Sequence, residues 1–195
     1  MGDPKRPKKA YTTPHHPWIR ERIEEERKLL REYGLKNKKE IWRMESMLRN
    51  YKAQAKKLIA LRGSQAEKEK RALLEKLLRY GLVKETTAVD PVLDLSLRDI
   101  LERRLQTQVF KKGFARSPKQ ARQFITHQHI MVNGKTVSVP SYLLTMQEES
   151  LLSFYPHSSL NNAEHAERVV LEKKQKPEKR KPQRRMGGRR FSQKK

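Results

Sequence analysis

The sequence predicts an α+β protein in which a helical unit precedes a small antiparallel sheet. In the first 85 residues, apolar positions recur at intervals of three and four, as on one face of an α-helix. Further along, Asn133 and Gly134 separate two short runs of β-branched residues, which is the pattern of a β-hairpin. Both ends of the chain are rich in Lys, Arg and Pro, so we expect basic, extended termini outside the core.

These patterns divide the chain into four segments: a basic extended arm at 1–17, a helical domain at 18–90, a small module at 91–157 and a basic, disordered tail at 158–195. The formal net charge of the 195 residues is +24. Most of it falls at the two ends, with +10 in residues 1–62 and +9 in residues 156–195. We therefore expect a folded centre with two arms that attract polyanions.

The helical domain is expected to contain three helices. The first covers residues 18–33 and ends at Gly34, since glycine favours the turn that stops a helix. Asn37 and Glu40 form a capping pattern for the second helix, whose apolar stripe continues to Gly63.

A similar pattern, Ser64 with Glu67, is expected to cap the third helix, which ends at Gly81. The apolar stripe of the second helix should face the core. Basic side chains that lie largely off this stripe are then available to a partner, and these are Arg49, Lys52 and Lys56.

The module should begin with two short helices. Ser96 and Asp99 mark the start of one helix, which is expected to continue to Gly113. The next helix starts at Ser117, with proline at the first helical position and Gln120 three residues after the cap.

This second helix has two chemically different faces, because successive residues are about 100° apart around a helix. The apolar face carries Ala121, Phe124 and Ile125. The opposite face carries Lys119, Arg122, Gln123 and Thr126. After the helix, Asn133-Gly134 suits the positive φ angles of a type I′ turn, and Lys135 lies beside that turn. Further short strands are expected from Val139, Tyr142 and Leu143 and from residues 151–155.

The charge makes nucleic acid the leading partner, because neutralising phosphates releases counterions. A membrane surface is the competing partner, but no segment approaches the ~18 apolar residues of a spanning helix. The N-terminal residues lack the apolar run of a signal peptide, and the chain has no cysteine for disulfides. We therefore expect a cytoplasmic protein without membrane association.

No group of residues in the sequence suggests catalysis. There is no Gly-rich phosphate loop and no Cys/His pair. His15-His16 and the pair His127 and His129 are too closely spaced for two ligands one helical turn apart, and no cysteine or carboxylate pattern accompanies them. We predict a protein that is not an enzyme and has neither a cofactor nor a metal. His127 and His129 are then expected at the junction of helix and hairpin as polar or stacking contacts.

The chain resembles the S4 RNA-binding domain over residues 115–135, which read Ala-Arg-Ser-Pro-Lys-Gln-Ala-Arg-Gln-Phe-Ile-Thr-His-Gln-His-Ile-Met-Val-Asn-Gly-Lys, and at 139–142, Val-Pro-Ser-Tyr. This module alone also suits RNA-modifying enzymes and tRNA synthetases. The flanks narrow the choice, because they are similar to the archaeal and eukaryotic branch of the ribosomal protein S4 family. These flanks are 32–43, Glu-Tyr-Gly-Leu-Lys-Asn-Lys-Lys-Glu-Ile-Trp-Arg, and 101–111, Leu-Glu-Arg-Arg-Leu-Gln-Thr-Gln-Val-Phe-Lys. Many bacterial members carry an N-terminal cysteine cluster for zinc, which this chain lacks.

The resemblance implies a structural constituent of the small ribosomal subunit. Family members bind the rRNA directly at a five-way junction of the 5′ domain and nucleate assembly of the subunit body. They lie beside a protein of the S5 family, near the mRNA entry channel, and contribute to translational accuracy. RNA junctions are recognised through shape, phosphates and 2′-hydroxyls, which suits basic surfaces rather than a base-reading pocket.

We predict two RNA-facing surfaces. The first belongs to the module and consists of Arg103, Arg104, Arg116, Ser117, Lys119, Arg122, Gln123, His127, His129, Asn133 and Lys135. The second consists of Arg49, Lys52 and Lys56 with the N-terminal arm. Two such surfaces would hold converging RNA helices at a fixed angle and raise the effective concentration of each contact.

Two alternatives remain at this point. One is an RNA-binding assembly or modification factor that uses the same module, although 195 residues leave no room for a catalytic domain. The other is a non-specific nucleic-acid-binding protein that compacts DNA, for which any basic surface is sufficient. An ordinary solvated surface explains any single basic residue equally well. It explains less well a group that comes from one helix face, its entry loop and the adjacent hairpin.

Overall fold

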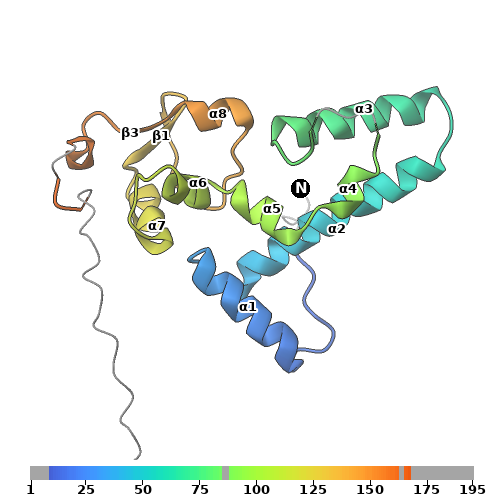
Figure 1. Ribbon diagram of the computed structural model, residues 1–195, viewed down its shortest axis with the longest axis horizontal. Helices are drawn as coiled ribbons and strands as arrows, with labels where there is room; N and C mark the ends of the chain where they lie inside the picture. The colour runs from blue at the N-terminus through green and yellow to red at the C-terminus, as the bar shows by residue number, and fades with distance from the viewer. Residues whose placement is uncertain (1–8, 85–87, 163–164, 168–195) are drawn as a thin grey trace, which may run out of the picture.

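The computed structural model describes residues 9–84, 88–162 and 165–167, and it is an α+β structure (Figure 1). In chain order the elements are α1 (Arg20–Glu32), α2 (Lys38–Ala60), α3 (Ser64–Arg79), α4 (Pro91–Asp94), α5 (Leu97–Glu102), α6 (Leu105–Lys111), α7 (Pro118–Thr126), β1 (Ile130–Val132), β2 (Lys135–Thr136), α8 (Met146–Ser150), β3 (Leu152–Phe154) and the short 3₁₀ helix η1 (Ser159–Asn161). The first residues of the expected arm and most of the expected disordered tail lie outside the described residues.

The expected three-helix unit is present as α1, α2 and α3, with α2 and α3 packed side by side (Figure 1). Asn37 caps α2 as predicted, because its side chain accepts a hydrogen bond from the backbone N–H of Glu40. The Glu40 carboxylate, however, accepts from the backbone N–H of Lys36 and turns toward other partners. The predicted cap at Ser64 is wrong: Ser64 is the first residue of α3, and Gly63 is the N-cap without a side-chain bond.

The single helix expected from Ser96 to Gly113 is instead two helices, α5 and α6. Their start is as predicted, since Ser96 and Asp99 form a reciprocal capping box. The break comes at Arg104, whose backbone is extended (φ −71°, ψ 143°) and pairs with Leu143 in an isolated β-bridge. The segment that precedes α8 therefore takes backbone hydrogen bonds that a continuous helix would have used.

The C-terminal elements match the expected hairpin. Ser117 caps α7 by accepting from the N–H of Gln120. Asn133 and Gly134 have φ values of 49° and 75°, as a type I′ turn requires, and β1 pairs antiparallel with both β2 and β3 in the order β2-β1-β3. Residues 139–143 do not form the expected strand; their one β-type pairing is the isolated bridge between Leu143 and Arg104.

Buried apolar side chains form two clusters. One gathers residues of α1 to α5, which we call the N-terminal half, and the other gathers residues of α6 to η1, the C-terminal half. Leu101 belongs to the first cluster and Leu105 to the second, so the clusters divide later in the chain than the expected boundary at residue 91. Figure 1 shows the C-terminal half beside the start of α2 and the end of α3.

No helix in the described part of the chain is long and apolar enough to cross a membrane.

Candidate RNA-binding surface

The outer side of α7 carries exposed polar and cationic side chains. Ala121, Phe124 and Ile125 point into the core, with no more than 2% of each exposed. Their burial leaves Lys119 and Gln123 in solvent, as the helical periodicity predicts.

The entry to α7 adds a further cation. Arg116 is exposed, and its guanidinium donates a hydrogen bond to the carbonyl of Ala166. Ser117, partly buried, is held in its capping role, so its contribution is to position the start of α7.

Arg103 and Arg104 do not belong to this exposed surface, which corrects the sequence prediction. Arg104 is 1% exposed, and its Nη2 donates to Glu40 Oε2 over 2.7 Å. The Arg103 side chain is 11% exposed and donates to Glu149 Oε2 over 2.7 Å. Both arginines lie at the junction of the two halves, where the break between α5 and α6 turns them inward toward carboxylates.

Arg122 is also engaged inside the molecule. Its side chain is 26% exposed, and its two terminal nitrogens lie 2.9 and 3.3 Å from the two carboxylate oxygens of Glu40. Burial acts to raise the pKa of Glu40, but the hydrogen bonds from Arg122 and Arg104 outweigh it and leave that pKa below its ordinary value. The charge of Arg122 is therefore largely committed to Glu40.

A groove of about 850 Å³ lies beside the hairpin turn, between the end of α7 and the segment after β3. It is lined by His127, His129, Lys135, Tyr155 and His157, among others. The imidazole rings of the first two are nearly parallel, 16° between planes and 6.2 Å between centroids. Aromatic rings beside an ammonium group can stack on bases and contact phosphate.

Two aromatic residues of this groove, Tyr155 and His157, are not among the site residues predicted from the sequence. Their rings are 5.5 Å apart, at 60° to each other. The sequence did contain a signal for them: Tyr155 ends the apolar run 151–155, and His157 follows two residues later. One ring nitrogen of His129 is already engaged within the protein, since its Nδ1 lies 2.8 Å from Ser158 Oγ.

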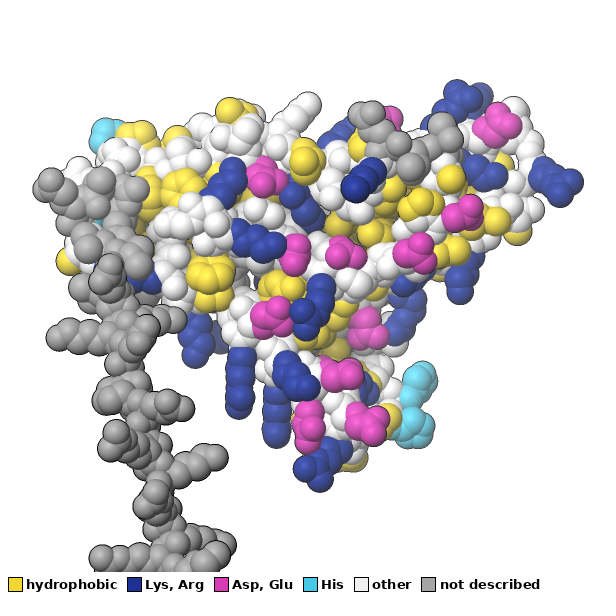
Figure 2. Space-filling view, viewed as in Figure 1, with side chains coloured by type: hydrophobic (Ala, Val, Ile, Leu, Met, Phe, Trp, Pro, Cys, Tyr) yellow, Lys and Arg dark blue, Asp and Glu magenta, His cyan; other side chains and the backbone are white. Residues whose placement is uncertain are grey.

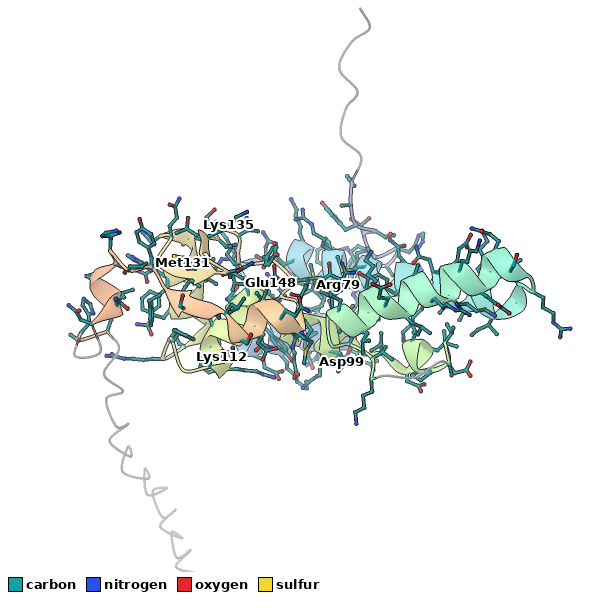
Figure 3. The ribbon with its side chains drawn as sticks, turned by 90° about the horizontal axis from the view of Figure 1, so that it is seen from above. Arg79, Asp99, Lys112, Met131, Lys135 and Glu148 are labelled. Carbon is teal, nitrogen blue, oxygen red and sulfur yellow. The ribbon has the colours of Figure 1, made fainter. Side chains whose placement is uncertain are left out.

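Asn133 and Lys135 are exposed at the hairpin. Asn133 occupies the first turn position, so its exposure follows from the turn geometry. Seen from above, Lys135 lies on the opposite edge of the molecule from Lys112 (Figure 3).

The three basic residues of the second predicted surface lie close together on α2. Arg49, Lys52 and Lys56 line one shallow depression of about 350 Å³ on this helix. Arg49 is paired with Glu45 at 3.2 Å, but this pair is exposed and therefore weak. Part of the arm follows the same helix: the backbone N–H of Thr12 donates to Ser46 Oγ over 3.0 Å.

Two family models match consecutive parts of the chain. The one described as "Ribosomal protein S4/S9 N-terminal domain" matches residues 5–102, and the one described as "S4 domain" matches residues 103–150. A relative from Methanococcus aeolicus is 56% identical over 170 residues, which cover 87% of this chain and 96% of the relative. Relatives from Methanococcus maripaludis (52% over 171 residues; 87% and 96%) and Ignicoccus hospitalis (51% over 158 residues; 81% and 95%) are similar. All three are named small ribosomal subunit protein uS4.

The chain belongs to the uS4 family. This confirms the resemblance drawn from residues 115–135 and their flanks, including its archaeal branch. The two family matches of this uS4 chain meet between Glu102 and Arg103, at the break between α5 and α6.

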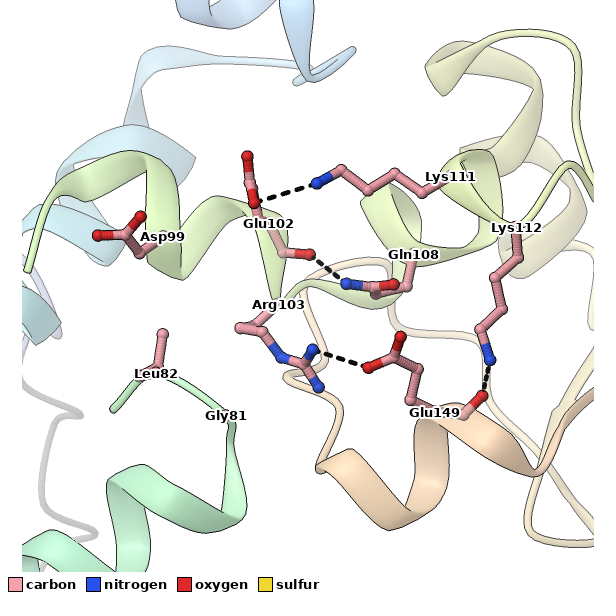
Figure 4. Close-up of a pocket in the computed structure, with 9 residues that line it drawn as sticks. All are labelled: Gly81, Leu82, Asp99, Glu102, Arg103, Gln108, Lys111, Lys112 and Glu149. Carbon is pink, nitrogen blue, oxygen red and sulfur yellow. Dashed lines mark hydrogen bonds and ion pairs between the residues drawn. The ribbon is translucent and has the colours of Figure 1, made fainter. Parts of the chain in front are cut away.

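The uS4 chain has one more charged cleft, of about 520 Å³, at the junction of its halves (Figure 4). Four of its ionic groups form two pairs: Arg103 with Glu149, and Lys111 with Glu102 at 3.0 Å. Lys112 donates to the backbone carbonyl of Glu149. Arg103 and Lys111 are therefore paired with carboxylates, whereas exposed Lys112 keeps its charge and is held by a backbone carbonyl.

On the face seen in Figure 2, Lys and Arg side chains are spread over the N-terminal half and interspersed with Asp and Glu. Within residues 9–84, 88–162 and 165–167, no three His, Asp or Glu side chains are grouped so as to hold a metal ion.

Proposed function

We propose that this uS4 chain is a structural, rRNA-binding constituent of the small ribosomal subunit, without a catalytic role. The observation that carries the proposal is the close likeness to proteins of that name over nearly their whole length. The exposed cations of α7 and the aromatic groove beside them supply the chemistry that such a role needs. Assembly into this particle would place the protein in the cytoplasm.

Contact with RNA is proposed for two surfaces. We define the module surface as Arg116, Lys119, Gln123, His127, His129, Asn133, Lys135, Tyr155 and His157. We define the α2 surface as Arg49, Lys52 and Lys56. Ser117 supports the first by capping α7, and Arg103, Arg104 and Arg122 are left out because they are paired internally.

The finer assignments follow from the family resemblance. The RNA target would be a multi-helix junction of the 5′ domain of the small-subunit rRNA, and binding would nucleate assembly of the subunit body. Neighbours would include a protein of the S5 family and the mRNA near its entry channel, with a contribution to translational accuracy. Four segments would serve this role: the arm at 1–17, the helical domain at 18–90, the RNA-binding module at 91–157 and the basic tail at 158–195.

Filter binding to the 5′ domain of small-subunit rRNA tests the proposal. The full chain should bind this RNA more tightly than an unrelated structured RNA of equal length, and more tightly than duplex DNA. The logarithm of the binding constant should fall linearly with the logarithm of salt concentration, because phosphate contacts release counterions. Equal affinity for all three nucleic acids would refute a specific ribosomal role and favour a non-specific binder.

A further inference from the structure

The two halves of the molecule are joined by consecutive arginines that reach different partners. Arg104, from the C-terminal side of the break, binds Glu40 on α2 of the N-terminal half. Arg103 binds Glu149 on α8, and also donates to the carbonyl of Leu144 over 3.3 Å. The chain therefore crosses from one half to the other at a point held by ion pairs.

Glu40 is shared by two arginines of the other part of the molecule. Arg104 and Arg122 come from the start of α6 and from α7, and both donate to the single carboxylate of Glu40. Among the described residues, Glu40 is the only hydrogen-bond partner of the Arg104 guanidinium, whose Nε and Nη1 are buried without one. Loss of this carboxylate would leave a buried cation uncompensated, which is costly in proteins.

A buried amide reinforces the same junction. Gln106 of α6 is 1% exposed, and its Nε2 lies 3.2 and 3.0 Å from the carbonyls of Tyr33 and Gly34. The same atom lies 2.8 Å from the carbonyl of Pro118. This side chain thus joins the turn between α1 and α2 to the start of α7.

The other side of the junction is closed by α8. Arg103 donates to the side-chain carboxylate of Glu149 on that helix, and Lys112 donates to the backbone carbonyl of the same residue (Figure 4). At its first residue, Met146, α8 touches Gly81 at the end of α3: an added Cβ at Gly81 would lie 2.3 Å from the Met146 sulfur. The helix therefore bridges the C-terminal half to the end of α3.

We propose that Arg103, Arg104 and Arg122, with Glu40 and Glu149, are positioning residues that fix the angle between the two halves. The planar guanidinium binds a carboxylate in a defined direction, which an apolar contact of the same area does not. The consequence for RNA rests on the proposed function. By fixing the angle, these ion pairs set the spacing of the module and α2 surfaces, and so select RNA in which two helices converge at a matching angle.

The angle can be measured without RNA. Because the chain contains no cysteine, Gln54→Cys on α2 and Thr126→Cys on α7 provide two unique sites for spin labels. Double electron–electron resonance should give one narrow distance distribution for the otherwise wild-type chain. Glu40→Gln and Arg104→Met should broaden or shift it, while the helical circular dichroism is kept. Arg79→Gln is the matched control, because the Arg79–Glu75 pair at 3.1 Å is exposed and lies within α3.

If Arg104→Met fails to fold, Arg122→Gln serves instead, since it removes two hydrogen bonds to Glu40 from a partly exposed position. Wild-type distance distributions in Glu40→Gln and in the folded arginine variant would overturn the proposal.

RNA binding then tests the consequence. The first RNA probe is a junction in which two helices converge, and the second is a single hairpin. The same variants should lose about tenfold or more in affinity for the junction, while their affinity for the hairpin stays within about twofold. Only binding of both protein surfaces to one RNA depends on the angle between the halves. A changed distance with unchanged junction affinity would overturn the link to RNA selection. Failure of the wild-type chain to prefer the junction would instead refute the proposed function and leave the distance result standing.

Discussion

At Gly34, substitution by alanine should destabilise the fold in two ways. The added methyl group should strain the backbone, and it should also collide with residues of the C-terminal half. The φ of Gly34 is +61°, in the left-handed region that favours glycine. A Cβ added there would lie 2.7 Å from Pro118 Cβ, 3.0 Å from the Pro118 carbonyl carbon and 3.1 Å from Gln106 Nε2. The turn between α1 and α2 therefore has no room for a side chain where it meets α7.

The expected cost of Gly34→Ala has two parts. The left-handed conformation costs an L-residue about 1–2 kcal/mol, and reduced freedom of the unfolded chain returns about 0.4–1 kcal/mol. Forcing a methyl into a packed contact adds about 1–3 kcal/mol, because Pro118 is rigid and its backbone would have to move. We expect the free energy of unfolding to fall by about 1–4.6 kcal/mol in total.

Gly113→Ala is the matched control. Gly113 also has a positive φ, +77°, but an added Cβ would meet nothing within 4 Å. This variant should lose about 1 kcal/mol or less, from the backbone alone. Urea unfolding followed by circular dichroism gives both values. Equal losses in the two variants would refute the steric part of the reasoning and show that the halves adjust freely at Gly34.

Three further predictions concern the core, the junction and the module surface. Phe124→Ala should lower the free energy of unfolding by about 3–5 kcal/mol, measured by urea titration, because Phe124 is 2% exposed. The pKa of Glu40 is lowered by folding, so its contribution to stability is present above its unfolded pKa and lost as pH falls through the folded one. Urea titrations between about pH 5 and pH 3 should show a steeper loss in the wild type than in Glu40→Gln, and parallel curves would contradict the lowered pKa. Lys119→Glu should weaken rRNA binding in filter assays without changing the free energy of unfolding. Arg122→Glu should instead destabilise the fold, because the new carboxylate would face that of Glu40. Unchanged RNA binding in Lys119→Glu would show that Lys119 does not belong to the module surface.

Local structure was predictable where one or two neighbouring residues decide it. The capping box of Ser96 with Asp99, the cap at Ser117 and the turn at Asn133-Gly134 all form as expected, because each depends on groups within three residues. Ser64 failed as a cap because Gly63, with φ of +133°, adopts the N-cap position one residue earlier.

The break between α5 and α6 was not predictable in this way. The apolar spacing around Arg104 fits a continuous helix, but the N–H of Leu105 donates to the carbonyl of Tyr142 over 2.7 Å. The N–H of Leu144 likewise donates to the carbonyl of Arg103 over 3.0 Å. Partners some forty residues away override a local preference when they satisfy the same backbone groups.

The sequence by itself determined the family, the helix-then-sheet order and the exposed face of α7 at Lys119 and Gln123. These depend on residue types and on spacing along one element. Only the tertiary structure decided which arginines are free. Arg104 and Lys119 look alike as basic residues, but Arg104 meets Glu40 across 64 positions of sequence and is buried, while Lys119 faces solvent. Burial of a charge depends on a partner brought near by folding, and no local pattern records that partner.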